Sequence, residues 1–252
     1  MMSPLSAEAF LSTAQGRRAQ CWEAAQYKKL VENAFGYRAL QVGLPSMNTL
    51  KANRIHSRWI VDPVFAESIP DPRSGLSAAA GLPEALPFAD ESFDLVCLPH
   101  TLDLSPNPQQ CLREAVRVLC PQGRLVLTGF NPLSLWWLRQ KGVHLGLPPY
   151  LPSRVVPLPL LRLKDWFSLL NLRLDRGHFG VYAPACHSET AFDRWRWLDK
   201  AGDRWAPHCA NLIALSAVKE IPGVRLIGRK TFKKTPKLVG TPSPAPAPKQ
   251  AR

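Results

Sequence analysis

Four short segments place polar or flexible residues at the points where apolar stretches of the chain end. They are Gln41-Val42-Gly43-Leu44-Pro45, Val61-Asp62-Pro63, Leu98-Pro99-His100-Thr101 and Gly129-Phe130-Asn131-Pro132. A glycine after one strand lets the backbone approach a bound cofactor, and an acid after the next strand can accept hydrogen bonds from ribose hydroxyls. Gly43 and Asp62 are 19 residues apart, which suits that division. A turn glycine and a surface acid explain the same two residues equally well.

Two further residues have side chains suited to act on a substrate. The imidazole of His100 has an ordinary pKa of about 6.5, which suits proton removal at neutral pH, and the amide of Asn131 can orient an acceptor group. Both follow predicted strands, so we take them as the candidate catalytic residues. The alternatives are that His100 caps a loop and that Asn131-Pro132 is an ordinary turn pair.

The elements that must position these residues are clearest in the middle of the chain. Residues 92–102 begin with a nearly continuous apolar run of the length of a buried strand. Asn107 and Pro108 then mark the start of a helix. Its apolar positions share one face at helical spacing: Leu112, Ala115, Val116 and Leu119. Because a second apolar strand follows at 123–130, the sequence predicts a βαβ unit of a parallel sheet.

The same alternation continues on both sides of this unit. We expect further helices at 21–35, 46–54, 161–171 and 188–202, and further strands at 38–44, 57–63, within 75–88, at 172–183 and at 209–220. In the first helix we expect the following side chains to be buried: Trp22, Ala25, Leu30 and Phe35. The pattern predicts one α/β domain over residues 1–224, with a helical segment at 1–36 and a basic, Pro/Ala-rich tail at 225–252.

The central motifs resemble those of a known family. LPFADESFDLV, an HTL turn and then REAVRVLCPQG and GFNP stand in the order found in class I S-adenosylmethionine-dependent methyltransferases of the small-molecule and quinone-methylating type. The match is good over residues 80–130 and looser from 38 to about 220. GFNPLSLWWLR and LKDWFSLLNL further resemble a bacterial subgroup of methyltransferase-like proteins.

The resemblance implies a Rossmann-like, mostly parallel sheet of seven strands, with an antiparallel last strand at 209–220 and helices on both faces. It also implies S-adenosylmethionine as cofactor, laid across the ends of the first four strands. Its residues would be the following: Gln41 and Gly43 beside the methionine part, Asp62 on the ribose, Leu82 beside the adenine, and the main chain of Leu98 and Pro99 facing the amino group.

The chain departs from the family pattern at three places. Gln41 stands where the family has an acid, and Leu44-Pro45 replaces further glycines of the first loop. Proline has no backbone N–H to donate and restricts that loop. Leu82 stands where an Asp is common, and a lost carboxylate removes a hydrogen bond of about 1–3 kcal/mol. These departures motivate an alternative function, a non-catalytic binding or regulatory protein that retains the fold.

A long proline-broken insertion, residues 133–160, follows the strand predicted at 123–130. Active-site lids come from such loops, so we interpret the insertion as an apolar lid over a small or lipophilic acceptor. Contact with a membrane surface beside Arg139 and Lys141 is a second interpretation, and for Trp136 we prefer plain packing against the sheet. We interpret three later tryptophans as buried helix anchors: Trp195, Trp197 and Trp205.

Composition and charge exclude several classes of protein. Hydrophobic residues make up 46% of the 252 residues, which excludes wholesale disorder. The sequence contains no apolar run of about 18 residues and no secretory signal pattern, so we expect a cytoplasmic protein without a membrane span. The tail has eight Lys or Arg and no acid, which leaves only +5 of the total charge of +13 for residues 1–224. A basic tail alone does not indicate nucleic-acid binding, so an RNA-modifying enzyme is the least favoured function.

The six cysteines indicate no metal site. None forms a Cys-x-x-Cys pair, and the doublets Cys186-His187 and His208-Cys209 would need unusual turns to converge on one ion. Reduced structural thiols are the simpler interpretation. The sequence therefore predicts a methyltransferase that uses S-adenosylmethionine on a small or lipophilic acceptor, with no metal.

Overall fold

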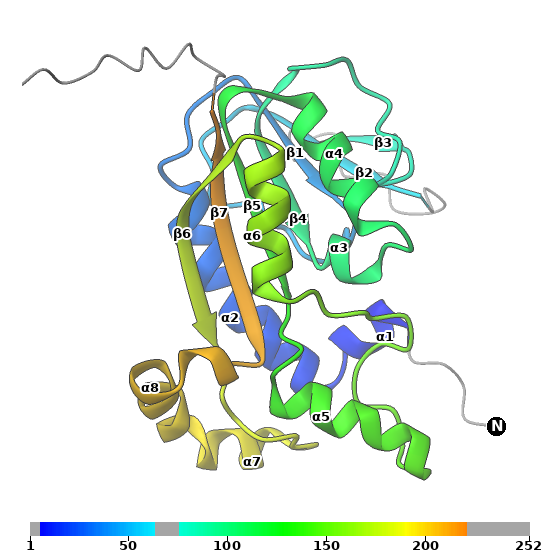
Figure 1. The fold of residues 1–252 in the computed structure, drawn as a ribbon, viewed down its shortest axis with the longest axis vertical. Helices are drawn as coiled ribbons and strands as arrows, with labels where there is room; N and C mark the ends of the chain where they lie inside the picture. The colour runs from blue at the N-terminus through cyan, green and yellow to red at the C-terminus, as the bar shows by residue number, and fades with distance from the viewer. Residues whose placement is uncertain (1–5, 64–75, 221–252) are drawn as a thin grey trace, which may run out of the picture. The chain divides into compact units, whose positions relative to one another are not determined.

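A seven-stranded sheet with the strand order β3-β2-β1-β4-β5-β7-β6 organises the chain (Figure 1). The computed structural model describes residues 6–63 and 76–220. These belong to one of two compact units, Met1–Pro222, and the other, Gly223–Arg252, lies outside the described residues. The predicted tail lies outside them as well, so its prediction stays open. None of the described helices is long and apolar enough to cross a membrane.

The described strands and helices follow one another along the chain in a regular alternation. The strands are β1 (Arg38–Val42), β2 (Ser57–Asp62), β3 (Leu76–Ala80), β4 (Phe93–Pro99), β5 (Leu119–Phe130), β6 (Leu172–Gly180) and β7 (Leu212–Lys219). The helices are α1 (Ala7–Leu11), α2 (Ala14–Val31), α3 (Thr101–Leu104), α4 (Pro108–Val118), α5 (Leu135–Lys141), α6 (Leu160–Leu169), α7 (Glu189–Arg194) and α8 (Arg196–Trp205), with short 3-10 turns η2 (Gly142–Leu145) and η3 (Pro207–Cys209).

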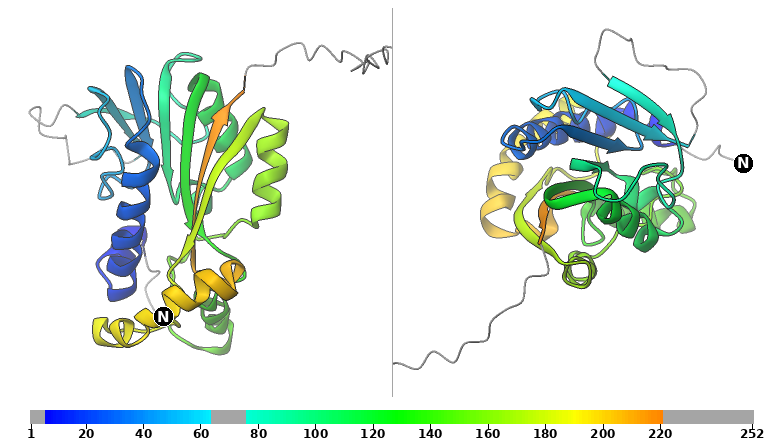
Figure 2. Two further views of the ribbon diagram at one scale, coloured as in Figure 1. Left: turned by 90° about the vertical axis from the view of Figure 1, so that its left-hand side faces the viewer. Right: turned by 90° about the horizontal axis from the view of Figure 1, so that it is seen from above.

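Helices cover both faces of the sheet, with α2 on one face and α4 and α6 on the other (Figure 2). Residues alternate between these faces along β4: Leu95 and Cys97 pack with Tyr27 and Leu30 of α2, whereas Leu98 packs in the core beneath α4 and α6. Strands buried on both faces are nearly continuous in apolar residues, as the sequence of β4 is. The expected α/β sheet with helices on both faces is confirmed.

The direction of the strands confirms the expected topology. β3, β2, β1, β4 and β5 run parallel, and β7 is antiparallel to both β5 and β6. Strand order reverses between β1 and β4, and ligands of such sheets bind outside the carboxyl ends of the strands at that point. The structure thus fixes where a ligand site is to be sought.

Three helix predictions are wrong in part. Residues 46–54 form turns, in which Asn53 bonds to another part of the chain: its Nδ2 donates to Val31 O and to Ala34 O, and its Oδ1 accepts from Ile55 N. The helix predicted at 21–35 begins at Ala14, seven residues earlier than predicted. The third case is the segment 188–202, which divides into α7 and α8.

The earlier start of α2 also changes which of its side chains are buried. Leu30 is buried as predicted and Trp22 is partly so, but Ala25 and Phe35 are exposed.

The three tryptophans predicted as buried anchors near α7 and α8 differ from the prediction as well. Trp197 and Trp205 are exposed and Trp195 is only partly buried.

Candidate functional site

The carboxyl ends of β1, β2 and β3 bring three of the predicted cofactor residues into one row. Gly43 N donates to Val61 O at 2.7 Å, and Asp62 is paired with Ala80 in the register of β2 and β3. Leu82 follows β3 and is 57% exposed. Gly43, Asp62 and Leu82 therefore lie in succession along the edge where strand order reverses.

The backbone conformation at position 43 explains why a glycine stands at this edge. Its φ of +79° lies in the left-handed region that favours glycine, and an added Cβ would be 3.5 Å from Thr101 Oγ1, an ordinary contact distance. The Thr101 hydroxyl donates to Val42 O at 2.5 Å and lies 3.3 Å from Pro99 O. Thr101 thus ties the end of β1 to the end of β4 across the switch point.

Gln41 holds the loop that follows β1. Its Nε2 donates to Gly43 O and Leu44 O at 3.2 and 2.9 Å, and its Oε1 accepts from the backbone and hydroxyl of Thr49. The side chain is buried, so its whole amide is used inside the protein. The predicted contact of Gln41 with a cofactor stays a prediction. What the structure shows is that the Gln41 side chain holds the loop together through hydrogen bonds to Gly43, Leu44 and Thr49, which we call the Gln41 clasp.

The residues after Gly43 fill the inside of the loop with apolar contacts. Leu44 has a φ of +43° and is buried in a cluster with Met47, Phe130 and Tyr150. Pro45 is exposed. The loop therefore presents Gly43 and Pro45, and not Leu44, on its outer side.

Leu98 and Pro99 contribute only main-chain atoms to the edge. The side chain of Leu98 is fully buried in the core, and Pro99 is also buried. Both residues pair with β5 through the register of β4. Their predicted role, which needs only a main-chain oxygen, is compatible with this burial and stays a prediction.

His100 lies in the interior beside the switch point. It takes a left-handed backbone conformation at the start of α3, and its ring stacks on Phe130 with centroids 4.3 Å apart. Its Nε2 is 2.7 Å from Glu23 Oε1, an ion-pair distance without the alignment of a hydrogen bond, and its Nδ1 is 3.3 Å from Asp103 Oδ2. His100 and Glu23 are both buried, so two carboxylates from α2 and α3 enclose one imidazole.

This environment keeps the imidazole protonated. Burial alone lowers the pKa of His100, but the negative charge of Glu23 and the hydrogen bond with Asp103 outweigh it and raise the pKa to about 10. A general base near neutral pH must be unprotonated and must reach its substrate. The predicted role of His100 as a base stays a prediction, and what the structure shows is a buried, protonated imidazole between the carboxylates of Glu23 and Asp103.

Asp103 connects this cluster to the end of β5. Its Oδ2 accepts from Phe130 N at 2.6 Å, and burial raises the pKa of its carboxyl. A Cβ on Gly129 would lie 2.8 Å from the same oxygen, so only glycine fits there. The glycine of the sequence GFNP is thus explained by the approach of a carboxylate.

Asn131 is used in the same way as Gln41. Its Nδ2 donates to His208 O and Ala210 O at 2.7 and 2.8 Å, and its Oδ1 accepts from Leu133 N. Both amide donors are occupied, so Asn131 fastens the turn after β5 to the segment before β7. Its predicted contact with an acceptor stays a prediction.

Known methyltransferases match the central part of the chain. A profile described as "Methyltransferase domain" matches residues 65–127. The Escherichia coli (strain K12) protein YafS is 45% identical over 92 residues, and the Bartonella tribocorum ubiquinone/menaquinone biosynthesis C-methyltransferase UbiE is 42% identical over 55 residues. Over these matched residues the chain is similar to class I S-adenosylmethionine-dependent methyltransferases. The matched regions cover 36% and 22% of this chain, and 38% and 21% of those two relatives.

A solved structure agrees with the family in fold. A methyltransferase from Thermotoga maritima superposes on this chain with a TM-score of 0.56 and 14% identity, covering 82% of this chain and 93% of that one. At this identity the likeness shows the fold alone. The methyltransferase fold expected from the motifs LPFAD, REAVRVL and GFNP is confirmed.

The chain has no helix between β1 and β2. The connection runs from Gly43 to His56 through turns, although crossovers between parallel strands are usually helical. A helix N-terminus after β1 would offer backbone N–H groups to a charged ligand. The loop instead relies on Gln41 and Thr49 for its shape, which adds to the departures seen at Pro45 and Leu82.

Sequence reasoning did not identify three residues that the structure brings to the switch point: Glu23, Thr101 and Asp103. Glu23 lies four residues after the buried Ala19 and four before the buried Tyr27, so it shares their helical face. That spacing is visible in the sequence once the helix is started at Ala14. An acid on the apolar face of a helix is the signal that was missed.

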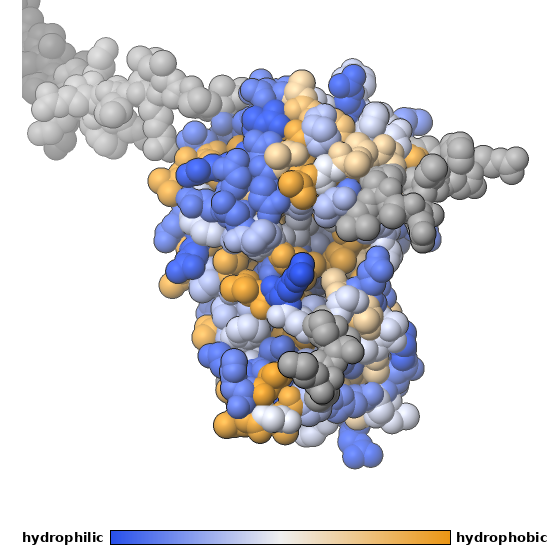
Figure 3. All heavy atoms as spheres, turned by 90° about the vertical axis from the view of Figure 1, so that its right-hand side faces the viewer, coloured by the Kyte–Doolittle hydropathy of each residue, from blue (hydrophilic) through white to orange (hydrophobic). Residues whose placement is uncertain are grey.

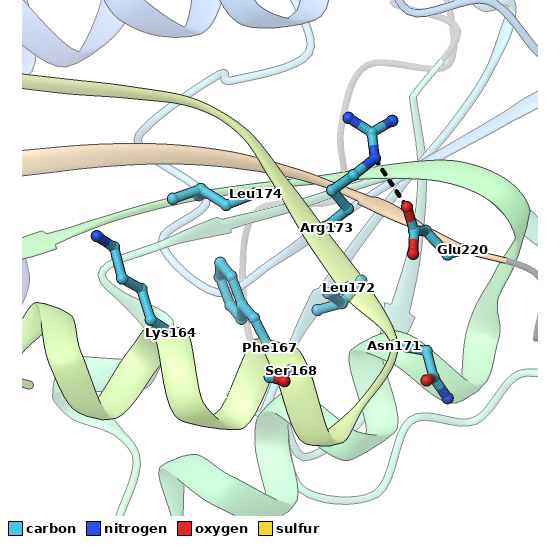
Figure 4. Close-up of a pocket in the computed structure, with 8 residues that line it drawn as sticks. All are labelled: Lys164, Phe167, Ser168, Asn171, Leu172, Arg173, Leu174 and Glu220. Carbon is cyan, nitrogen blue, oxygen red and sulfur yellow. Dashed lines mark hydrogen bonds and ion pairs between the residues drawn. The ribbon is translucent and has the colours of Figure 1, made fainter. Parts of the chain in front are cut away.

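A pocket lies away from this edge, between α6 and the start of β6 (Figure 4). Its volume is about 430 Å³, and Phe167 and Leu172 form part of its wall. Arg173 and Glu220, which also line it, pair with each other at 2.8 Å. None of the predicted site residues lines this pocket, so it is not part of the candidate site.

Among the described residues, no group of His, Cys, Asp or Glu is arranged to hold a metal ion.

Proposed function

We propose that the chain transfers the methyl group of S-adenosylmethionine to a small or lipophilic acceptor. The observation behind this proposal is the row of Gly43, Asp62 and Leu82 along the carboxyl edge of β1, β2 and β3. It lies where strand order reverses, the position at which ligands of open α/β sheets bind. Similarity to the family supports the same cofactor.

The residues of the edge fit the cofactor in three respects. The left-handed Gly43 offers backbone without a side chain, and Asp62, at the end of β2, would accept from ribose hydroxyls. The exposed Leu82 offers an apolar surface to an adenine ring. The bound cofactor supplies a methyl group already activated by a sulfonium, so the protein has mainly to position the acceptor in line.

We propose positioning roles for His100 and Asn131. His100 holds Glu23 of α2 and Asp103 of α3 together, and Asp103 in turn accepts from Phe130 N at the end of β5. Asn131 fastens the next turn to the segment before β7. Together they fix the backbone at the ends of β4 and β5, beside which an acceptor would bind.

Thermal unfolding with and without ligand tests this proposal. A ligand that binds only the folded chain stabilises it by RT ln(1 + [L]/Kd), about 1.4 kcal/mol at ten times Kd. We expect S-adenosylmethionine and S-adenosylhomocysteine at millimolar concentration to raise Tm by several degrees, and ATP to leave it unchanged. An unchanged Tm with both sulfur ligands would reject the enzyme.

That result would instead support the alternative, a non-catalytic protein that keeps the methyltransferase fold. The structure offers a specific observation in its favour. The loop after β1 contains Pro45, lacks a following helix and uses Gln41 as an internal clasp. These features remove donors that a cofactor would otherwise find there.

A further inference from the structure

The insertion between β5 and α6 has an inner side that is bound firmly to the rest of the unit. Trp136 is fully buried, and its indole N–H donates to Ala183 O at 3.1 Å. Gln140 Oε1 accepts from both Tyr150 N and Leu151 N at 2.8 Å. The insertion is therefore an ordered part of the structure.

The outer side of the same insertion exposes large apolar side chains. Leu133 is 72% exposed, Leu138 66% and Leu145 86%, and every residue of the segment 143–148 is exposed. We call Leu133, Leu138, Leu145 and Leu147 the leucine face. Exposed apolar groups gathered on one ordered segment mark a surface that another body covers.

The charge of this segment has one sign. Residues 115–164 contain no Asp or Glu, and Arg139 and Lys141 stand directly beside the leucine face. Lys141 is exposed, and Arg139 donates to Pro148 O at 3.2 Å. Cations beside apolar side chains, with no acid among them, match a negatively charged apolar partner.

A second exposed segment, α8, adds aromatic rings. Trp197 and Trp205 are 60% and 81% exposed. The exposed charged residues of α7 and α8 include arginines and acids in equal number: Arg194, Arg196, Arg204, Glu189, Asp193 and Asp203. Tryptophan is enriched at membrane–water interfaces, where its apolar ring and polar N–H both find partners. Because the charges of the described exposed side chains of α7 and α8 cancel, the two helices together contribute to such a surface through the rings of Trp197 and Trp205.

These segments lie at one end of the unit. Figures 1 and 2 place α5, α7 and α8 together beyond the sheet, and hydrophobic side chains are visible at that end in Figure 3. The buried side of the insertion shares a cluster with Leu44, which follows Gly43. The leucine face is thus the outer surface of a segment whose inner surface supports the candidate site.

We propose that this end of the protein binds the surface of an anionic phospholipid bilayer. The leucine face would enter the boundary between headgroups and acyl chains, with Arg139 and Lys141 at the phosphates and the tryptophans of α8 at the headgroups. Lysine is depleted in protein–protein interfaces, whereas interfacial segments combine leucine, tryptophan and basic residues. The charge therefore favours a lipid surface over a protein partner.

This role goes beyond the proposed methyl transfer and does not depend on it. A chain that bound vesicles but not S-adenosylmethionine would keep this inference and lose the proposed function. If both hold, the bilayer is the source of the lipophilic acceptor.

Flotation of the full chain with vesicles tests the proposal. We expect binding to vesicles of phosphatidylcholine with phosphatidylglycerol, and a loss of about tenfold or more in the L138E/L145E variant. The matched control is L161E/L169E, which changes two leucines of α6 that are 75% and 74% exposed, and it should bind like the original chain. Both variants keep the basic tail, so charge outside the leucine face cancels in the comparison.

Three outcomes would overturn the proposal. The first is no binding of the unaltered chain, and the second is equal binding by both double variants. The third is a dimer in sedimentation analysis that L138E/L145E dissolves while vesicle binding stays unchanged, because the leucine face would then be covered by a second copy. An independent readout needs no variant: brominated phosphatidylcholine in anionic vesicles should quench the tryptophan fluorescence of the chain, and unquenched fluorescence would contradict insertion.

Discussion

His100 Nε2 and Glu23 Oε1 lie 2.7 Å apart, and side-chain exposures of 4% and 0% keep this ion pair from water. Burying two charges is costly, and removing one partner of such a pair leaves the other uncompensated. The pair joins α2 to the end of β4 at the point where strand order reverses. Its protonation is therefore linked to the stability of the fold.

Stability should fall as the pH rises. The folded-state pKa of His100 is about 10, above its ordinary value of about 6.5, so its contribution is complete below pH 6.5 and is lost through about pH 10. Urea unfolding between these values should show a free energy of unfolding that falls by up to about 1.4 kcal/mol per pH unit. Glu23→Gln should flatten this slope, and Glu189→Gln, an exposed acid paired with Arg17, should not.

The comparison is best made below about pH 9. Burial raises the pKa of Cys97 to about 12, so this thiol adds a slope of the same sign at higher pH. Equal slopes for the original chain and Glu23→Gln below that value would contradict the assigned role of the pair.

Restoring the acid that the family has at position 41 should harm this protein. In Gln41→Glu a carboxylate would face Gly43 O and Leu44 O, to which Gln41 now donates. We expect a loss of about 2–4 kcal/mol in the free energy of unfolding at neutral pH, recovered in part as the pH falls and the buried carboxyl is protonated. Chemical denaturation checks this, with Gln109→Glu on the exposed first turn of α4 as control. A fully stable Gln41→Glu would show that the clasp is dispensable.

Gly43 offers a test that separates backbone strain from ligand contact. Gly43 and Gly146 have φ values of +79° and +84°, so alanine at either should cost about 1–2 kcal/mol of stability. Only Gly43→Ala adds a side chain at the proposed cofactor edge, so it alone should weaken S-adenosylmethionine binding, by about tenfold or more. Equal binding by the two variants would place the ligand elsewhere.

The loss of stability on replacing a tryptophan should depend on how deeply that tryptophan is buried. Trp136→Ala removes a fully buried indole and its hydrogen bond to Ala183 O, and should cost about 3–5 kcal/mol in the free energy of unfolding. Trp205→Ala removes a side chain that is 81% exposed and should change stability by less than about 0.5 kcal/mol. Denaturant titration of both variants measures the difference, and comparable losses would mean that Trp205 is buried in solution.

The strands could be predicted from the sequence because a parallel sheet buried on both faces demands continuous apolar runs. Phe93–Pro99 is such a run, and Asn107 caps α4 through Gln110 N as its position predicts. The helix predicted at 46–54 failed because Asn53 and Thr49 form hydrogen bonds that a local pattern does not contain. Tertiary partners, not propensity, decide such segments.

The candidate site could be predicted only where the backbone decides it. The positions of Gly43 and Asp62 follow from the ends of strands, and those ends were readable. The roles of His100 and Asn131 depend on Glu23, Asp103 and segments more than 70 residues distant, such as His208 O. Sequence position indicates that these residues follow β4 and β5, but the partners that bury them come from distant parts of the chain and cannot be read from it.

Calorimetric titration of the full chain with S-adenosylmethionine tests the central claim, that the edge at Gly43, Asp62 and Leu82 holds this cofactor. We expect saturable binding heat, an affinity weakened by about tenfold or more in Asp62→Ala, and no change in Asp165→Ala, an exposed acid on α6. Absence of heat at millimolar cofactor, or equal affinity of Asp62→Ala and the original chain, would contradict the claim.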